Sequence, residues 1–423
     1  MRHTVCSCGW GRGFFLALVV VACAACGLAQ DTANVLFSFN GAFGPGNLLL
    51  DSTGNLYGTV ASGGTYSQGA LFELERSQSG TWHEALLHTF TGGLDGGNPT
   101  SALVMDPAGN LYGTTGQGGD LTCQEYGNGV GCGIVFELTR TAAGGWKEVV
   151  LHTFLGGKRD GIQPLDGLTL DVAGNLYGTT AGGGGQGNGA VFKLARTSKG
   201  WKFSVIHSFA ASEGLGGNRL IADAAGNLYG TTGNGGNFLN CSGGGCGLVF
   251  QLTPTWGGLW KMSILYTFTG GPDGAQPNTS LTFDTAGNLY GPGWKGGSSN
   301  DGVVFKLTPG SGGTWTESVL YSFTQGSGQA GSAPSALTFD GAGNLYGTIA
   351  IGGLYNYGAV FELTPSGGNW TESTLYSFTG GDDGSLPYGG AIFDSAGNLY
   401  TSASFDGSLD GGTILKLTPP ATK

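Results

Sequence analysis

A ten-residue phrase that recurs seven times constrains this chain more than any other feature. The phrase is DPAGNLYGTT at residues 106–115, and its variants begin at an Asp at positions 51, 106, 171, 223, 284, 340 and 394. The intervals between these Asp residues run from 52 to 65 residues. Such self-similarity indicates a repeat architecture, in which one unit cannot bury its own apolar surface. The chain is therefore expected to fold by stacking seven similar units.

Each repeat contains four short segments with the composition of strands. The first ends at the Asp, as in residues 102–105, and the second is the Asn-Leu-Tyr-Gly-Thr segment. The third resembles Val-Phe-Glu-Leu, as in residues 135–138, and the fourth begins near a Trp and ends in Leu-Tyr-x-Phe, as in residues 265–268. Four strands in about 55 residues make one blade of a β-propeller. We predict an all-β fold: a seven-bladed β-propeller of four-stranded antiparallel blades.

The two ends of the repeat region complement each other. The last repeat stops after its third segment, Ile414–Leu417, whereas Val35–Phe39 precedes the first repeat as an unpaired fourth segment. Placing this N-terminal strand beside the last blade completes seven blades and closes the ring. We predict one propeller domain over residues 31–420, followed by a tail at 421–423.

The compound motif also resembles a known family. The run D-x-x-G-N-L-Y-G-T-T, then G-x-V-F-x-L, L-Y-x-F and G-G-x-D-G-x-x-P, is similar to the Gloeo/Verruco (GloVer) tandem repeat over residues 33–418. The resemblance implies an exported bacterial repeat protein without an assigned activity. Because the sequence reads to Lys423 without a C-terminal membrane or sorting segment, we expect it to differ from the anchored members of the family. The shorter phrase D-x-x-G-N-x-Y resembles NHL-type propellers and implies a fold but no function.

The first 30 residues have the composition of an export signal. Arg2 and Arg12 precede an apolar run over residues 14–25 and a small-residue stretch ending at Ala29. The run is shorter than the roughly 20 residues that span a bilayer, which favours a secretory signal cleaved near Ala29. A lipoprotein signal that leaves Cys23 lipidated at a membrane is an alternative, and an uncleaved anchor is another. We therefore expect a secreted, periplasmic or cell-surface protein.

Charge and cysteine content narrow the possible partners. Removal of residues 1–30 takes away two cations and no acids, which changes the net charge from −11 to −13. Nucleic acids and anionic membranes bind basic faces, so neither is expected as a partner, except for a membrane if Cys23 is lipidated. Four cysteines then remain in two local pairs within Gly-rich insertions, and we expect two disulfides and a monomer. The pairs are Cys123 with Cys132 and Cys241 with Cys246.

The repeated hairpin Asp has a structural explanation. An Asp at the first position of a turn accepts backbone N–H groups, and a Gly at the fourth closes the turn in the left-handed region. The histidines in the fourth segments, His88, His152 and His207, occupy positions that hold Tyr in later repeats. A position shared by His and Tyr favours ring packing over proton transfer. No G-x-S-x-G, P-loop or His-x-x-x-His motif accompanies them, so no catalytic residue is predicted.

Binding is expected where the repeats differ. Loops after the second and fourth strands open on one face, which carries both cysteine insertions, irregular aromatic residues and Asp-Gly turns. Variable loops on a rigid scaffold commonly carry binding sites. The candidate ligand-binding residues are Asp95, Asp160, Asp273, Asp383, Trp294, Tyr355 and Tyr357. No cofactor or metal site is predicted, because the Asp-Gly turns lack the remaining ligands of a calcium loop; calcium binding by them is the weaker alternative.

Three functions are compatible with this pattern. The leading one is non-catalytic recognition of an extracellular glycan or protein on the long-loop face. The second is hydrolysis or cleavage of a polysaccharide by acids that meet near the propeller axis, which requires a pair of carboxyl groups in one pocket. The third is that of a structural surface protein whose repeats serve display alone.

Overall fold

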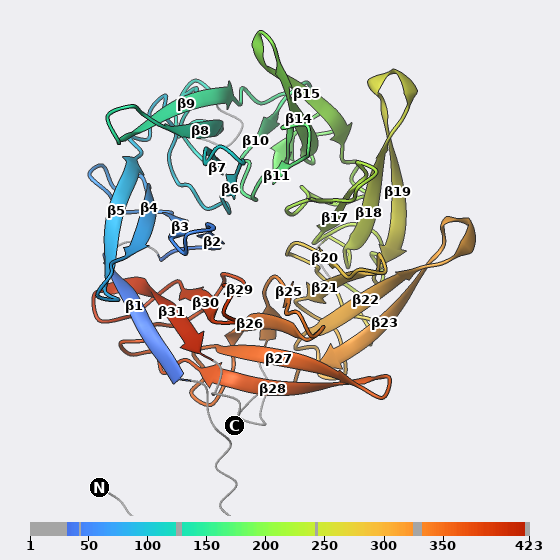
Figure 1. The fold of residues 1–423 in the computed structure, drawn as a ribbon. Helices are drawn as coiled ribbons and strands as arrows, with labels where there is room; N and C mark the ends of the chain where they lie inside the picture. Colours follow the sequence, from blue (N-terminus) through green and yellow to red (C-terminus); the bar gives the residue numbers. More distant parts are fainter. Residues whose placement is uncertain (1–31, 42–43, 124–128, 242–243, 325–331, 419–423) are drawn as a thin grey trace, which may run out of the picture.

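The chain folds as a seven-bladed β-propeller, as the repeat predicts (Figure 1). The structure is a computed structural model that describes residues 32–41, 44–123, 129–241, 244–324 and 332–418. The first strand of each blade lies nearest the central axis and the fourth lies at the rim. The expected export signal at residues 1–30, including Cys23, lies outside the described residues.

Successive strands of a blade pair antiparallel. Blade 1 comprises β2 (Leu49–Leu50), β3 (Leu56–Val60), β4 (Ala70–Arg76) and β5 (Trp82–Thr89). Blade 2 comprises β6 (Val104–Met105), β7 (Leu111–Thr115), β8 (Ile134–Arg140) and β9 (Trp146–Thr153). Blade 3 comprises β11 (Thr169–Leu170), β12 (Leu176–Thr180), β14 (Ala190–Thr197) and β15 (Gly200–Ser208). Blade 4 comprises β16 (Ile221–Ala222), β17 (Leu228–Thr232), β18 (Leu248–Pro254) and β19 (Trp260–Thr267).

The remaining blades repeat this order. Blade 5 comprises β20 (Thr282–Phe283), β21 (Leu289–Gly293), β22 (Val303–Pro309) and β23 (Trp315–Ser322). Blade 6 comprises β25 (Thr338–Phe339), β26 (Leu345–Ile351), β27 (Ala359–Ser366) and β28 (Asn369–Ser377), and β24 (Ser332–Pro334) also pairs with β26. Blade 7 comprises β29 (Ile392–Phe393), β30 (Leu399–Ala403), β31 (Asp410–Thr418) and β1 (Thr32–Asn40). Short 3₁₀ turns, η1 (Trp256–Gly258) and η2 (Ser311–Gly313), lie between third and fourth strands.

The N-terminal strand closes the ring, which confirms the predicted complementarity of the chain ends. β1 pairs antiparallel with β31 from Thr32 opposite Thr418 to Asn40 opposite Asp410. The ring of Phe39 is buried and lies 5.0 Å from the ring of Phe72 in blade 1. Blade 7 is therefore built from both ends of the propeller, and blades 7 and 1 share a core.

The hairpin Asp residues organise the turn between the first two strands of every blade. In blade 4, Oδ1 of Asp223 accepts the backbone N–H groups of Ala225 and Asn227, and Oδ2 accepts the side-chain amide of Asn227 and the hydroxyl of Tyr229. The other six turns keep the two backbone bonds and the bond from the Tyr hydroxyl. The repeated Asp thus fixes the turn and the orientation of the following Tyr.

The Gly that follows this Tyr on the second strand lies against a large Phe side chain on the third strand, and the sizes of the two residues are complementary. A Cβ placed on Gly113 would lie 2.5 Å from the ring of Phe136, and the corresponding Gly residues of blades 1 and 3–6 are equally close to a Phe. Blade 7 instead has Thr401 opposite Leu415. The larger residue on the second strand accompanies a smaller one on the third, so close packing is kept.

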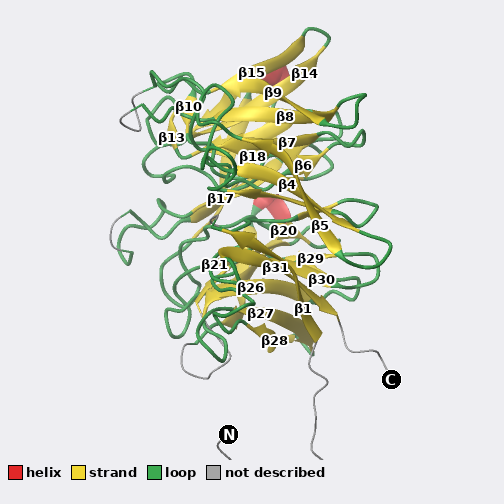
Figure 2. Ribbon diagram, turned by 90° about the vertical axis from the view of Figure 1, so that its left-hand side faces the viewer, coloured by secondary structure: helices red, strands yellow, loops and turns green. Residues whose placement is uncertain are grey.

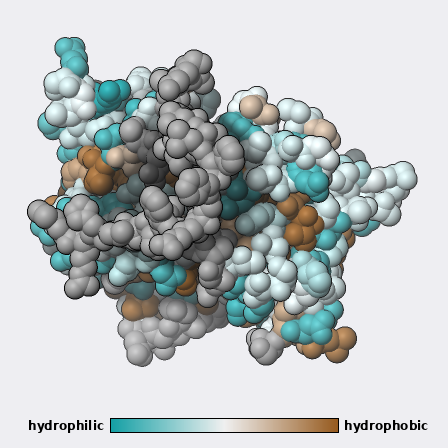
Figure 3. Space-filling view, turned by 90° about the horizontal axis from the view of Figure 1, so that it is seen from below, coloured by the Kyte–Doolittle hydropathy of each residue, from teal (hydrophilic) through white to brown (hydrophobic). Residues whose placement is uncertain are grey.

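The long loops lie on one face, together with β10 (Gly161–Ile162) and β13 (Gly182–Gly183), and the short turns lie on the other (Figure 2). Both cysteine pairs are on the long-loop face and form the expected disulfides, Cys123–Cys132 and Cys241–Cys246. Within the described residues no helix is long and apolar enough to cross a membrane. Exposed hydrophobic side chains appear as separate patches among polar ones in the view of Figure 3.

Candidate functional site

The first strands of all seven blades surround a channel on the propeller axis. Its inner part has a volume of about 600 Å³ and is lined mostly by aliphatic, Thr and Ser side chains, including Leu49 and Leu170. Toward the long-loop face, residues that precede the first strands line a further cavity of about 230 Å³. Asn47, Arg219, Ser280 and Ala336 line both parts, so the cavity opens into the channel. We call this part of the channel the axial cavity.

Asp166 and Arg219 carry the charges of the axial cavity. Both side chains remain partly accessible because they face the cavity, although protein surrounds them. Burial raises the pKa of Asp166 to about 7, and the positive charge of Arg219 offsets part of that rise. Burial in turn lowers the pKa of Arg219. A carboxyl group that titrates near neutrality inside a concave site is typical of functional sites.

Aromatic and amide side chains complete the cavity wall. Trp294 and Tyr388 line it together with Asn47 and Asn278. The indole Nε1 of Trp294 is buried and has no hydrogen-bond partner among the described residues. Asn47 accepts the backbone N–H of Gly390, and its amide N–H group is a potential donor to a ligand. An indole ring, a carboxyl, a guanidinium and amide groups thus line the axial cavity within one small volume.

The four predicted Asp residues do not meet in this cavity. Each lies on a different blade and bonds to the fourth, rim strand: Tyr266 donates to Asp273 at 3.0 Å and Tyr376 donates to Asp383 at 2.8 Å. Asp273 and Asp383 also accept the backbone N–H of the Thr four positions earlier. The carboxylates are therefore held within their own turns, away from the axis at which the hydrolase alternative needs them.

The remaining two Asp residues face histidines in the same arrangement. Nε2 of His152 lies 3.1 Å from Asp160, and Nε2 of His88 lies 3.5 Å from Asp95. Burial lowers the pKa of His88, and the charge of Asp95 partly offsets this. These rings take the place of Tyr266 and Tyr376, as the sequence predicts. The ligand-binding role predicted for the four Asp residues stays a prediction.

The predicted aromatic residues fall in two places. Trp294 follows β21 and lines the axial cavity. Tyr355 and Tyr357 lie in the loop after β26, where about half of each side chain is exposed. A Cβ on Gly380 would lie 2.6 Å from the ring of Tyr357, which places that ring beside the turn that contains Asp383. Of the three predicted aromatic residues, Trp294 therefore lines the axial cavity and the two Tyr residues lie in a loop outside it.

The sequence-based prediction did not include Asp166 and Arg219, because it was based on the long loops and the recurrent motifs. The signal that could have found them is an alignment of the repeats. Five residues before the hairpin Asp, the other blades carry Gly, Ser, Asn or Thr, and blade 3 carries Asp166. Four residues before it, the other blades carry Asn, Ala, Gly or Ser, and blade 4 carries Arg219. The two charges are departures of single repeats at axial positions.

The part of the chain that the structure describes contains no group of three or more His, Cys, Asp or Glu side chains arranged to hold a metal ion. The weaker prediction of calcium binding is not tested by this observation.

Comparisons with known proteins agree on the fold. A streptogramin B lyase structure superposes with a TM-score of 0.55 at 14% identity, covering 92% of this chain and 98% of that chain. The extracellular domain of a putative one-component system from B. thetaiotaomicron gives 0.53 at 13% identity and covers 91% of this chain, which spans 40% of that longer chain. At these identities the likeness shows the propeller fold alone.

The sequence comparisons identify the repeat. No curated protein sequence matches the chain. The Gloeobacter/Verrucomicrobia repeat matches residues 44–255 and again residues 238–423. These two matches include every strand of the propeller except β1, as the resemblance of the motif implied. The chain therefore belongs to the Gloeobacter/Verrucomicrobia repeat family.

Proposed function

We propose that this protein is an exported, non-catalytic recognition protein that binds a sugar unit of an extracellular glycan in the axial cavity. The observation that carries the proposal is the convergence of Asp166, Arg219 and Trp294 in about 230 Å³, at positions where most other repeats have small residues. A concave site with a few convergent polar groups on an otherwise apolar scaffold is the usual form of a small-ligand site.

The chemistry of these side chains suits a sugar. A carboxylate accepts hydrogen bonds from two neighbouring hydroxyl groups, and a guanidinium or amide donates to sugar oxygens. The indole N–H of Trp294 is one more donor, and it has no hydrogen-bond partner among the described residues. An aromatic face packs against the C–H groups of a pyranose while its polar edge stays available. The cavity is also too small for a protein surface, since a typical interface involves roughly 800 Å² on each partner.

The number of acidic side chains in the axial cavity favours binding over hydrolysis. Glycoside hydrolysis ordinarily uses two carboxyl groups about 5–10 Å apart on either side of the bond. Asp166 is the one acid among the described residues that line the axial cavity. Streptogramin B lyase is an enzyme with a similar fold, so the choice between binding and hydrolysis rests on the side chains and not on the fold.

Export is part of the proposal. Two disulfides are typical of proteins that fold in an oxidising compartment. The leader-like composition of residues 1–30 and the extracellular domain among the structural neighbours support the same location. An extracellular glycan is the ligand class that such a protein would encounter.

A glycan array probed with the full chain, with and without calcium, tests the proposal. We expect selective binding that falls at least tenfold in Trp294→Ala and in Arg219→Ala. The matched control is Trp256→Ala, because Trp256 is 98% exposed and lies on the short-turn face. Thermal unfolding of each variant checks that the fold is intact. A folded protein that binds no glycan, or that loses binding equally in Trp256→Ala, would overturn the proposal.

A further inference from the structure

Aromatic pairs bridge neighbouring blades on the short-turn face. The repeat Tyr on the second strand of one blade contacts the Trp that begins the fourth strand of the next. The ring centroids of these pairs lie 5.9–6.4 Å apart: Tyr112 with Trp201, Tyr177 with Trp260, Tyr229 with Trp315, Tyr290 with Trp370, and Tyr400 with Trp82. Tyr57 and Trp146 belong to one core cluster at the junction of blades 1 and 2. Six of the seven junctions thus receive a Trp.

The junction between blades 6 and 7 does not receive one. Tyr346 is the repeat Tyr there, and the fourth strand of blade 7 is β1, whose sequence TANVLFSFN contains no Trp. In blade 6, Trp370 lies opposite Pro365, two residues beyond Leu363. In blade 7 the described register begins with Thr32 opposite Thr418, so no described residue stands at the position equivalent to Trp370. Closure by the N-terminal strand therefore removes the Trp from one junction.

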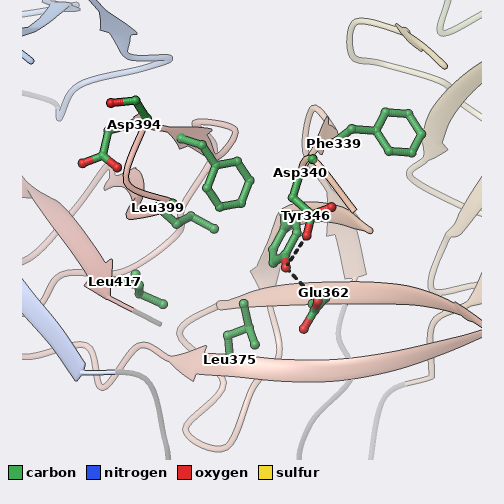
Figure 4. Close-up of a pocket in the computed structure, with 12 residues that line it drawn as sticks. Phe339, Asp340, Tyr346, Glu362, Leu375, Asp394, Leu399 and Leu417 are labelled. Atoms are coloured by element: carbon green, nitrogen blue, oxygen red, sulfur yellow. Dashed lines mark hydrogen bonds between the residues drawn. The ribbon is translucent and has the colours of Figure 1, made fainter. Parts of the chain in front are cut away.

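A pocket of about 540 Å³ lies at this junction (Figure 4). Phe339, Leu375, Leu399 and Leu417 form much of its apolar wall, and Tyr346 lies between them. The corresponding pocket between blades 5 and 6 has about 410 Å³, and its wall includes Trp370 and Pro365. The two pockets share equivalent residues on their other sides, so they are the same site of the repeat with and without its Trp. We call the pocket between blades 6 and 7 the indole slot.

Among the described residues, the slot also lacks the cation that accompanies a Glu at two equivalent junctions. Glu73 pairs with Arg140 at 3.3 Å, and the guanidinium of Arg140 lies 4.5 Å from the centre of the Trp146 ring. At the next junction Tyr112 donates to Glu137 and also contacts Arg196.

Glu362 is the third Glu at this repeat position, and Tyr346 donates to it at 2.7 Å and to Asp340 at 3.2 Å. Arg140 and Arg196 lie two residues after Leu138 and Leu194, and the described part of β31 ends at Thr418, one residue after Leu417. Within the described residues, no salt bridge reaches Glu362 or Asp340.

We propose that the indole slot binds a small aromatic cation, a planar ring of indole size that carries an amino group. The ring would occupy the volume that Trp370 fills one junction earlier and meet Tyr346 edge to face, an arrangement that is favourable for aromatic pairs. The ammonium group would replace the missing arginine beside Glu362 and Asp340 through charge-assisted hydrogen bonds. This site is on the face opposite the axial cavity and does not depend on the proposed glycan function.

Tryptamine is the probe, and indole-3-acetate is its control because it places a negative charge on the same ring. Isothermal titration of the full chain should show saturable tryptamine binding at least tenfold tighter than that of indole-3-acetate. Glu362→Gln should weaken tryptamine binding at least tenfold. The matched control is Glu137→Gln, at a junction whose slot is filled by Trp201, and it should leave binding unchanged.

Absence of saturable tryptamine binding, equal affinity for the two probes, or equal losses in Glu362→Gln and Glu137→Gln would each overturn the proposal. A crystal of the unchanged protein soaked with tryptamine provides a test that does not depend on a variant folding. Density for the ring between Tyr346 and Leu417 is the expected result, and density at another site alone would contradict it.

Discussion

The imidazole Nε2 of His152 lies 3.1 Å from the carboxylate of Asp160, in the position where Tyr266 presents its hydroxyl to Asp273. Two chemically different rings thus serve the same function, which is to hold the turn that follows the rim strand. The carboxylate also accepts the backbone N–H of Leu155. This arrangement explains why His and Tyr alternate at one repeat position, and it gives the Asp-Gly turns a structural role that can be measured.

Asp383→Ala should destabilise the propeller without weakening ligand binding at the axis. The change removes acceptors for the hydroxyl of Tyr376 and the backbone N–H of Thr379. Because these hydrogen bonds are only partly buried, we expect their loss to cost about 1 kcal/mol. Urea unfolding measures the loss, and Asp382→Ala, one residue earlier in an exposed position, is the control. Loss of glycan binding in a fully stable Asp383 variant would instead support the ligand role predicted from the sequence.

The hairpin Asp residues should make the fold sensitive to acid. Burial alone would raise the pKa of Asp223, but hydrogen bonds from Asn227, Tyr229 and Ala225 outweigh it and lower the pKa below its ordinary value of 3.8. The other six hairpin Asp residues are lowered in the same way. Their contribution to stability is present above pH 3.8 and is lost as the pH falls below that value.

Urea unfolding at pH values from 3 to 6 measures this effect. We expect the free energy of unfolding to fall steeply below pH 4, and Asp223→Asn to make the fall shallower. An unfolding free energy that stays constant down to pH 3 would contradict the assignment.

Glu317→Gln should stabilise the protein at pH 8. Burial, together with the negative charge of Asp273, raises the pKa of Glu317 from 4.5 to about 7, and its Oε1 is buried without a partner among the described residues. The protonated form is favoured in the folded state, so this contribution is complete below pH 4.5 and is lost as the pH rises through 7. After allowance for solvent screening we expect a gain of about 1 kcal/mol at pH 8 and none at pH 4. Equal effects at both pH values would exclude the titration of Glu317 as the cause.

Glycan binding at the axial cavity should strengthen as the pH rises from 6 to 8. Burial raises the pKa of Asp166 to about 7, and its ionised form accepts hydrogen bonds from hydroxyl groups more strongly than the protonated form. Affinity measured by titration should increase severalfold over this range. In Asp166→Asn the affinity should be lower and independent of pH, and a pH profile that persists in this variant would assign the titration to another group.

Closure by β1 should depend on Phe39. Its buried ring contacts Phe72 of blade 1, and loss of a buried Phe side chain costs about 3–5 kcal/mol. We expect Phe39→Ala to lower the midpoint of thermal unfolding by several degrees. Val35→Ala on the same strand is the control, because Val35 is 43% exposed. If the two variants unfold at the same temperature, the N-terminal strand does not stabilise the ring through this contact.

The sequence by itself determined the fold because the strands and turns of each repeat are specified by residues within that repeat. Asp223, Asn227 and Tyr229 lie within seven residues of each other, and their hydrogen bonds are local. The complementary ends of the chain, Val35–Phe39 and Ile414–Leu417, then left one way to complete seven blades. The disulfide pairing could also be predicted, because the paired cysteines are separated by only 9 and 5 residues.

The candidate sites were decided by the tertiary structure. Asp166 and Arg219 are 53 residues apart, and only the ring of first strands brings them into one cavity. The indole slot exists because a strand from the start of the chain replaces the Trp-bearing strand that other blades supply. Local sequence patterns predict hydrogen bonds between residues that are close in the sequence. A cavity depends instead on which distant side chains meet and on what is missing between them, and the closed ring determines both.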